Sequence, residues 1–279
     1  MPFTRINGAK LHYEDSGGDG EVIVFSHGLL HSCRMFDPQV VALSGHYRCV
    51  AYDHRGQGQS EVPSGSVVAI ETVYEDAVAL IESLGVGPVH FVGLSMGGFV
   101  GMRLAARRPD LLRSVVLLET AADEEPRQNL PKYTVLKWLA RTLGVGVVAR
   151  RVMPILFGPT FLSDPLRRAE VRLWRDRLST NKRNIYKAVN GVLKRSSVVH
   201  ELGAITCPAL VIHGDEDKAI VLSRGQALCD GIAGATMVTI AGAGHSSTIE
   251  QPDAVNAALI DFYDGLDQPA SRATPSGAA

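Results

Sequence analysis

Short apolar runs alternate with longer segments of helical periodicity along most of the chain. The runs are rich in Val, Ile and Leu, which is typical of parallel strands buried on both faces. Ahead of them, residues 3–16 alternate apolar and polar side chains around Asn7-Gly8, a dipeptide that favours a tight hairpin turn. The predicted strands after this hairpin are Glu21–Ser26, Tyr47–Tyr52, Val89–Leu94, Ser114–Leu118, Ala209–His213 and Thr236–Ile240.

Helical periodicity fills the gaps between these runs. In residues 70–84 and 95–108, apolar side chains recur every three to four positions, and the second segment stops at Pro109. A further helix is expected at residues 253–263, with Pro252 close to its first turn. Strands that alternate with helices indicate an α/β fold. We therefore predict a mostly parallel, eight-stranded sheet flanked by helices, with the hairpin at one edge.

One segment breaks this alternation. Residues 121–200 show helical patterns without a clear strand, and they contain both tryptophans, 16 of the 28 Lys and Arg and only 6 of the 29 Asp and Glu. Their net charge is +10, against −11 for the rest of the chain. We predict a helical cap at 121–200, inserted after the sixth strand, and a core formed by 1–120 and 201–266. Residues 267–279 lack large apolar side chains and are predicted to be disordered.

Composition excludes several classes of protein. With 46% hydrophobic and 20% charged residues, the chain of 279 residues can bury a large core and is not a disordered protein. Its four cysteines form no C-x-x-C pair, so neither a zinc ribbon nor a disulfide scaffold is indicated. A net charge of −1 predicts no binding of nucleic acid, and no apolar run is long enough for stable membrane insertion. The first residues show no signal peptide, so we expect a cytoplasmic protein.

The strongest local signal for chemistry is Gly93-Leu94-Ser95-Met96-Gly97-Gly98, which contains a G-x-S-x-G sequence. A predicted strand ends at Leu94 and a predicted helix begins after Ser95, which is the strand–turn–helix context of a nucleophile elbow. The glycines remove Cβ atoms that would clash in so sharp a turn. The turn presents the hydroxyl above the sheet edge, with the positive end of the helix dipole behind it. Ser95 is therefore the candidate nucleophile.

A serine hydroxyl needs a general base, and the base needs a group that orients it. His245 lies in Gly242-Ala243-Gly244-His245, directly after the last predicted strand, where a loop can return the imidazole to the serine. It is the only one of the nine histidines that follows Ser95 and lies in a glycine-rich loop of this kind. We therefore predict that His245 is the general base.

The run Gly214-Asp215-Glu216-Asp217 follows the strand that ends at His213, so three carboxylates compete to orient the base. The loop must carry the acid a few residues beyond the strand, which favours Asp217. Asp215 is close enough to the strand to be a turn residue. Glu119, just after the sixth strand, is a further candidate. Asp217 is our prediction, and Glu119, Asp215 and Glu216 remain alternatives.

Acyl transfer also needs N–H donors for the oxyanion. The first is the backbone amide of the residue after the nucleophile, Met96. The second is expected in the loop after the third strand, HGLL at 27–30, with the Leu29 amide as donor and Gly28 allowing close approach. Chemistry of this kind needs neither a metal ion nor an organic cofactor, and we predict none.

Five segments together resemble the α/β-hydrolase superfamily, in the usual order and at ordinary spacing. They are HGLL at 27–30, DHRGQGQS at 53–60, GLSMGG at 93–98, GDED at 214–217 and GAGH at 242–245. The segments FDPQVVAL, YDHRGQGQSEVPSG and HFVGLSMGGFVGMRLAARRPD are most similar to 3-oxoadipate enol-lactonases and related serine esterases and lactonases. The resemblance implies an α/β-hydrolase fold that cleaves a carboxylic ester or lactone through an acyl-enzyme.

The same serine, histidine and acid would also serve other reactions. A C–C bond hydrolase of ring-cleavage diketones and a perhydrolase or acyltransferase are alternatives, as is a ligand receptor without fast turnover. Dehalogenases and epoxide hydrolases of this superfamily use a carboxylate at the elbow, so Ser95 argues against both activities.

The expected partner of the site is a small-molecule ester or lactone. Leu30, with Leu29 and Met96, would give the floor of its pocket an apolar character. Trp138 and Trp174 are candidates for lining the pocket from the cap. The charge of +10 on the cap is compatible with an anionic substrate that is guided electrostatically, and a solvated basic surface is the alternative.

Overall fold

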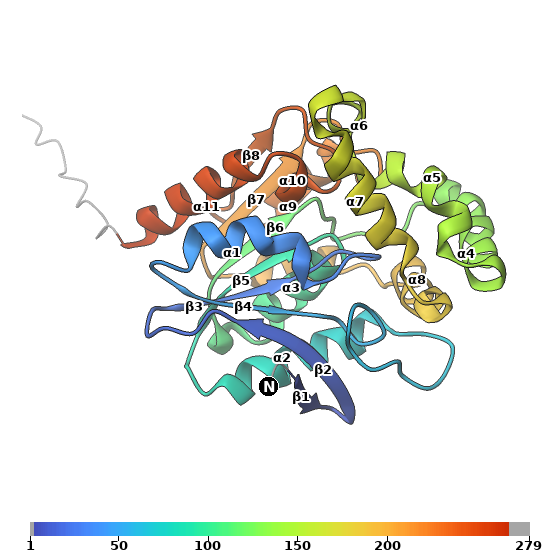
Figure 1. Cartoon of the computed structure of the whole chain (residues 1–279). Helices are drawn as coiled ribbons and strands as arrows, with labels where there is room; N and C mark the ends of the chain where they lie inside the picture. The colour runs from blue at the N-terminus through green and yellow to red at the C-terminus, as the bar shows by residue number, and fades with distance from the viewer. Residues whose placement is uncertain (1–2, 268–279) are drawn as a thin grey trace, which may run out of the picture.

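The chain folds around one eight-stranded sheet, seen in a computed structural model that describes residues 3–267 (Figure 1). The strand order across the sheet is β1-β2-β4-β3-β5-β6-β7-β8. The strands are β1 (Phe3–Ile6), β2 (Ala9–Asp15), β3 (Val22–Ser26), β4 (Arg48–Tyr52), β5 (Val89–Leu94), β6 (Leu112–Leu118), β7 (Ala209–Gly214) and β8 (Thr236–Ile240).

The six strands from β3 to β8 are parallel, and β1 and β2 form an antiparallel hairpin at one edge. At the hairpin turn, Asn7 and Gly8 have φ of 47° and 76°, the left-handed backbone that a two-residue hairpin loop requires. Every residue of β3 and β5 is buried. The predicted mostly parallel sheet, with central strands buried on both faces, is confirmed.

Helices cover both faces of the sheet. One face is packed by α1 (Asp37–Leu43) and α11 (Pro252–Asp267), which contact each other and the short α10 (Ser247–Glu250). The other face is packed by α2 (Ile70–Leu84), α3 (Met96–Arg107) and α9 (Leu222–Gly231). Because side chains alternate along a strand, Ile23 and Phe25 join the first of these cores and Val22 and Val24 the second.

Between β6 and β7 the chain leaves the sheet and forms a cap of helices, on the right in Figure 1. They are α4 (Leu130–Leu143), α5 (Val145–Leu156), α6 (Pro159–Ser163), α7 (Arg168–Ser179) and α8 (Tyr186–Leu193). All of them lie within residues 121–200, and that segment contains no strand. The predicted helical insertion after the sixth strand is therefore confirmed.

The end of the chain differs from the prediction. The last helix continues to Asp267, four residues beyond the expected boundary, so Asp267 does not begin an irregular tail. The remainder of the predicted disordered segment, residues 268–279, lies outside the described residues. Within residues 3–267, no helix is both long enough and apolar enough to cross a bilayer.

Candidate active site

Ser95 lies at a sharp turn between β5 and α3. Its φ and ψ are 51° and −105°, a combination that a residue with a Cβ atom rarely adopts. Two hydrogen bonds to the neighbouring strand and its loop fix the turn. Ser95 N donates to Leu118 O at 2.8 Å, and Thr120 Oγ1 donates to Ser95 O at 2.9 Å. These contacts hold a strained backbone of the kind found at functional sites.

Two glycines allow the chain to pass close to itself around Ser95. A Cβ atom at Gly97 would collide with the carbonyl of Ser26, and one at Gly98 would collide with the side chain of Thr120. The first turn of α3 can therefore approach β3 and the end of β6 only without side chains at these two positions. This is the close packing expected of the G-x-S-x-G turn.

His245 and Asp217 meet at the same edge of the sheet as Ser95. They lie in the loops that follow β8 and β7, and the carboxyl ends of parallel strands share one edge. His245 Nδ1 donates to Asp217 Oδ2 at 2.8 Å. Asp217 Oδ1 accepts from Ala219 N at 2.7 Å and Ile220 N at 3.0 Å, which fixes the plane of the carboxylate. The described residues include no hydrogen bond between Ser95 and His245, whose contact can tighten when substrate binds.

The other candidate acids make different contacts. Asp215 Oδ1 accepts from Gly242 N at 2.8 Å, and Glu216 Oε2 accepts from Thr160 N of the cap at 3.0 Å. Glu119 is fully buried and accepts from Gly214 N at 3.1 Å. Burial, together with the nearby Asp217 carboxylate, raises the pKa of Glu119 well above its usual range. Of the four candidates, Asp217 is the one that the structure places on His245.

Glu250, at the end of α10, is a site residue that the sequence analysis missed. Its Oε1 accepts from Ser246 N at 3.0 Å, and its Oε2 accepts from Gly244 N at 3.0 Å and Gly158 N at 2.7 Å. One carboxylate therefore fastens both neighbours of His245 and the start of α6 in the cap. Burial raises the pKa of Glu250 to about 7, although the three N–H donors act in the opposite direction.

The loop after β3 carries the expected oxyanion donor Leu29. Leu30, the next residue, has a left-handed φ of 72° and is held from both sides. Its amide donates to Gln57 Oε1 at 2.9 Å, and its carbonyl accepts from Asn181 Nδ2 of the cap at 2.9 Å. The amides of Leu29 and Met96 donate to no other group within residues 3–267, so both can donate to a ligand. Sequence reasoning did not identify Gln57, which lies in the DHRGQGQS segment without a role assigned to it, or Asn181, which lies in no motif.

A cavity of about 130 Å³ lies between the sheet edge and the cap. Ser95 and His245 both line it, and so do Leu29 and Leu30, as expected for the floor of the pocket. Met96, which was expected there too, is fully buried and does not line it. Its other walls come from α4, α5 and α8, and most of the side chains that they contribute are aliphatic. An apolar cavity of about this size in another protein holds a benzene molecule. The space next to Ser95 is therefore suited to an apolar group of roughly six carbon atoms.

The two tryptophans do not line this cavity, so the expectation that they do is wrong. Trp138 lies on the outer surface of α4, with 59% of its surface exposed. It follows Leu136, which points into the cavity, by two residues, and two residues are more than half a helical turn. Trp174 is buried on α7 and lines a neighbouring pocket, with its ring edge-on to His31 at 5.7 Å between centroids.

Charged side chains at the cavity have partners. Glu125 accepts from Arg195 Nη1 at 3.0 Å and from Asn129 Nδ2 at 2.8 Å. Lys137 is the one Lys or Arg of the described chain that lines the cavity, and its Nζ donates to Asn190 Oδ1 at 2.8 Å. The rest of the positive charge of the cap lies away from the cavity wall.

One group of the described residues has the spacing of a metal site, namely His12, Cys33 and Asp53. Asp53 already has three polar contacts: Oδ1 accepts from Cys33 N at 2.8 Å, and Oδ2 accepts from Gln59 N at 2.8 Å and lies 3.1 Å from His12 Nδ1. Burial raises the pKa of the Cys33 thiol, which disfavours the thiolate that a metal would need. These residues fasten the 53–60 turn and do not offer an open coordination site.

Comparison with known proteins shows the family of this fold. The sequence model of the alpha/beta hydrolase fold matches residues 21–252. The chain is 30% identical to 3-oxoadipate enol-lactonase 2 of Acinetobacter baylyi, over 89% of this chain and 91% of that protein. It is 27% identical to a protein of Agrobacterium fabrum that is named as the carbamate hydrolase RutD, over 92% and 100% of the two chains.

Two solved structures are also similar. The enol-lactonase from Burkholderia xenovorans LB400 has a TM-score of 0.87 at 34% identity, with 94% of this chain and 100% of that chain covered. A thermophilic esterase from Thermogutta terrifontis has a TM-score of 0.86 at 26% identity, with 96% and 98% covered. The match to the family covers well over half of the sequence and agrees with the observed fold. The chain belongs to the α/β-hydrolase family.

Proposed function

We propose that the protein is a serine hydrolase that cleaves a carboxylic ester or lactone through an acyl-enzyme. The observation that carries this proposal is the hydrogen bond of 2.8 Å from His245 to Asp217, beside a cavity that also exposes Ser95 on a strained turn. The similarity to enol-lactonases and to an esterase supports the same class of reaction.

In this mechanism, Ser95 Oγ attacks the carbonyl carbon while His245 Nε2 takes its proton. Asp217 holds the proton on Nδ1, so that Nε2 is the basic nitrogen. The amides of Leu29 and Met96 stabilise the negative oxygen of the tetrahedral intermediate. Collapse breaks the C–O bond, and the leaving alkoxide takes the proton from His245.

Water then completes the reaction. It attacks the acyl-enzyme while His245 removes one of its protons, and the second collapse returns a proton to Ser95 and releases the acid. With an open ester the alcohol departs before this step. With a lactone it remains attached to the acyl group, and one hydroxy acid is the product.

The lining of the cavity supports an uncharged, apolar group next to the reacting carbonyl. Lys137 is its one Lys or Arg within the described chain, and the Asn190 side chain already accepts a hydrogen bond from that ammonium group. An anionic substrate attracted by the cap stays a prediction. It requires the specificity constant for a carboxylate-bearing lactone to fall as ionic strength rises.

Carbamate hydrolysis is a second candidate, favoured by the similarity to proteins named as RutD. A carbamate carbonyl would use the same nucleophile, base and oxyanion donors. The two candidates differ in the leaving group and therefore in the substrates that are turned over.

Acid release in a pH-stat tests the proposal with lactones, esters of increasing chain length and a ring-cleavage diketone. Release of ammonia is measured in parallel for an unsubstituted carbamate, because its hydrolysis releases almost no net acid. Wild type is compared with Ser95→Ala, whose kcat is expected to fall by about 10⁴- to 10⁶-fold with unchanged Tm. If Ser95→Ala still turned over an ester or lactone at the rate of wild type, the assignment of Ser95 as nucleophile would be contradicted. Turnover of the diketone or the carbamate alone would replace the proposed substrate class.

A further inference from the structure

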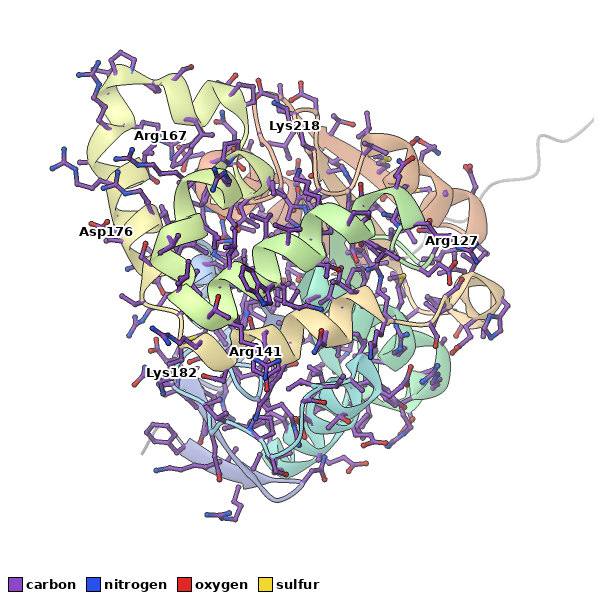
Figure 2. All side chains as sticks on the ribbon, turned by 90° about the vertical axis from the view of Figure 1, so that its right-hand side faces the viewer. Arg127, Arg141, Arg167, Asp176, Lys182 and Lys218 are labelled. Carbon is purple, nitrogen blue, oxygen red and sulfur yellow. The ribbon has the colours of Figure 1, made fainter. Side chains whose placement is uncertain are left out.

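The outer face of α4 and α5 exposes large apolar side chains. We use the name α4–α5 outer face for Val135, Trp138, Leu143 and Val147 together with the exposed basic residues Lys132, Arg141, Arg150 and Arg151. The exposed fractions of the four apolar side chains are 57%, 59%, 56% and 54% in that order. Figure 2 looks onto this side of the cap, with Arg127 and Arg141 labelled on it. Lys132 and Val135 of α4 line one surface hollow together with Arg151 of α5, and contiguous apolar patches on a protein surface can mark interaction sites.

The same face is basic and carries no negative charge. From residue 126 to residue 163 the sequence has six Lys and Arg and no Asp or Glu. Within the described chain, none of the four basic residues of the outer face forms an ion pair. Arg141 lies over the ring of Tyr186, and Arg150 and Arg151 are exposed. Their charge is available to an external partner.

The inner face of the same two helices forms the cavity next to Ser95. Leu136 and Ala140 of α4 and Val148 and Val152 of α5 line it. The cavity and the outer face therefore lie on opposite sides of the same two helices. A partner that carries apolar ester groups would bring them close to the site by contacting this surface.

We propose that the α4–α5 outer face docks the protein on an anionic lipid bilayer. Basic residues attract anionic headgroups, and a tryptophan among aliphatic side chains is suited to the boundary between headgroups and acyl chains. The contact is peripheral, because neither helix is long enough to span a bilayer. This docking does not depend on the proposed hydrolase activity.

A second copy of the chain is a less suitable partner. In a two-fold symmetric dimer the same patch faces itself, so Arg150 and Arg151 would approach the basic residues of the other copy. The exposed valines and leucine would also lack an apolar partner on the phosphate backbone of a nucleic acid. An anionic bilayer satisfies both the charged and the apolar part of this face.

Vesicle binding tests the proposal with Trp138 as a reporter. The Trp174→Phe variant leaves Trp138 as the only tryptophan, because the chain has two. We expect this variant to co-sediment with vesicles of phosphatidylcholine and phosphatidylglycerol (3:1) at least tenfold more than with phosphatidylcholine alone, at 50 mM NaCl. Its emission should shift to shorter wavelength on binding, and 500 mM NaCl should reduce the binding.

Charge variants locate the contact. Each basic residue near an anionic surface contributes about fivefold to partitioning, so Arg150→Gln with Arg151→Gln should weaken binding by about 25-fold. The matched control, Arg5→Gln with Lys10→Gln, removes the same charge from the exposed hairpin at the sheet edge and should weaken binding by less than about threefold. The Trp138→Ser variant should also bind more weakly, and Ser95→Ala should bind as the wild type does.

Three results would overturn the proposal. The first is equal binding to both kinds of vesicle, or none at low salt. The second is a loss in the hairpin control as large as that in the Arg150 and Arg151 variant. The third is a protein that is dimeric without lipid and becomes monomeric with Trp138→Ser, which would assign the face to a second copy.

Discussion

The loops at the sheet edge position their functional groups in one way, and the cap positions its side chains in another. In the loops, directed hydrogen bonds fix each polar group, as at Asp217, which accepts from His245, Ala219 and Ile220. In the cap, most of the side chains that line the cavity are aliphatic and define its space without directed contacts. Chemistry should therefore be sensitive to substitutions that conserve volume and change hydrogen bonding, and substrate choice to substitutions that change volume.

The two regions meet through a few polar contacts. Glu250 accepts from Gly158 of the cap, Glu216 accepts from Thr160, and Asn181 donates to the carbonyl of Leu30. Each contact joins the cap to a loop that carries the candidate base, acid or oxyanion donor. Movement of the cap would therefore change the positions of the reacting groups as well as the shape of the cavity.

The largest effect on the loops is expected from Asp217→Asn, which conserves volume. The Ala219 and Ile220 amides would hold the asparagine oxygen, so its NH₂ would face His245 Nδ1. The imidazole proton would then lie on Nε2, which could no longer accept a proton from Ser95. We expect kcat to fall by about 10³- to 10⁴-fold, measured by ester hydrolysis, with Tm little changed.

Asp215→Asn is the matched control for that variant. Its carboxylate contacts only Gly242 N among the described backbone amides, and an asparagine oxygen can accept the same bond. A loss below about threefold is expected. If both variants lost activity equally, the result would contradict the role of Asp217 as the carboxylate that orients His245.

Glu250→Gln tests the junction between the two regions through its dependence on pH. Burial raises the pKa of Glu250 to about 7 in the folded chain, from an ordinary value of 4.5. The folded state therefore holds this proton more tightly than the unfolded state does, and its stabilising contribution is lost as pH rises from about 4.5 through 7. The stability of wild type relative to Glu250→Gln should fall by roughly 2 kcal/mol between pH 5 and pH 8.

Urea unfolding at both pH values measures this difference. The exposed Glu124→Gln variant removes one carboxylate outside this network and is the control, and the stability difference between it and wild type should change much less between the two pH values. Parallel pH profiles for wild type and Glu250→Gln would show that Glu250 does not titrate in this range.

The cavity wall is tested by adjacent valines on opposite faces of α5. Val148 lines the cavity, and Val147 is exposed on the outside. Val148→Phe should reduce kcat/KM for an octanoate ester about tenfold relative to an acetate ester, because it fills the space of the acyl group. Val147→Phe should leave this ratio unchanged, and equal shifts in both variants would argue that the cavity does not select chain length.

A smaller effect is expected where the cap contacts the oxyanion loop. Asn181→Ala removes the donor to the Leu30 carbonyl and loosens the loop that carries the Leu29 amide. The loss of one such bond, about 1 kcal/mol, corresponds to a fall in kcat of about fivefold with little change in KM. Asn184→Ala, which removes a similar bond to the Gly56 carbonyl, should change kcat less. Equal effects of the two variants would mean that the loss of kcat comes from weaker packing of the cap on the core, and not from the oxyanion loop.

Local sequence signals predicted much of the fold and the order of the candidate site residues along the chain. The apolar runs gave the strands, because a strand buried on both faces cannot contain many polar residues. The elbow was predictable because Ser95 and its glycines are neighbours in sequence, and strain of that kind requires them. The loop positions of Asp217 and His245 followed from where the strands end.

Other features depended on contacts between distant segments. Glu250 is one acid in a polar stretch until the fold brings Gly158, 92 residues away, to its carboxylate. Gln57 and Asn181 likewise acquire a role only when Leu30 lies between them. No local pattern encodes such pairs.

The sequence by itself determined the class of fold, the strained serine and the order of the residues around it, because these follow from short-range periodicity and turn chemistry. Only the tertiary structure decided which face of α4 packs toward the cavity. That helix has apolar side chains on both sides, Leu136 and Ala140 toward the cavity and Val135 and Trp138 toward the outside. Its periodicity therefore does not identify the buried side, and packing of the cap against the core selects it.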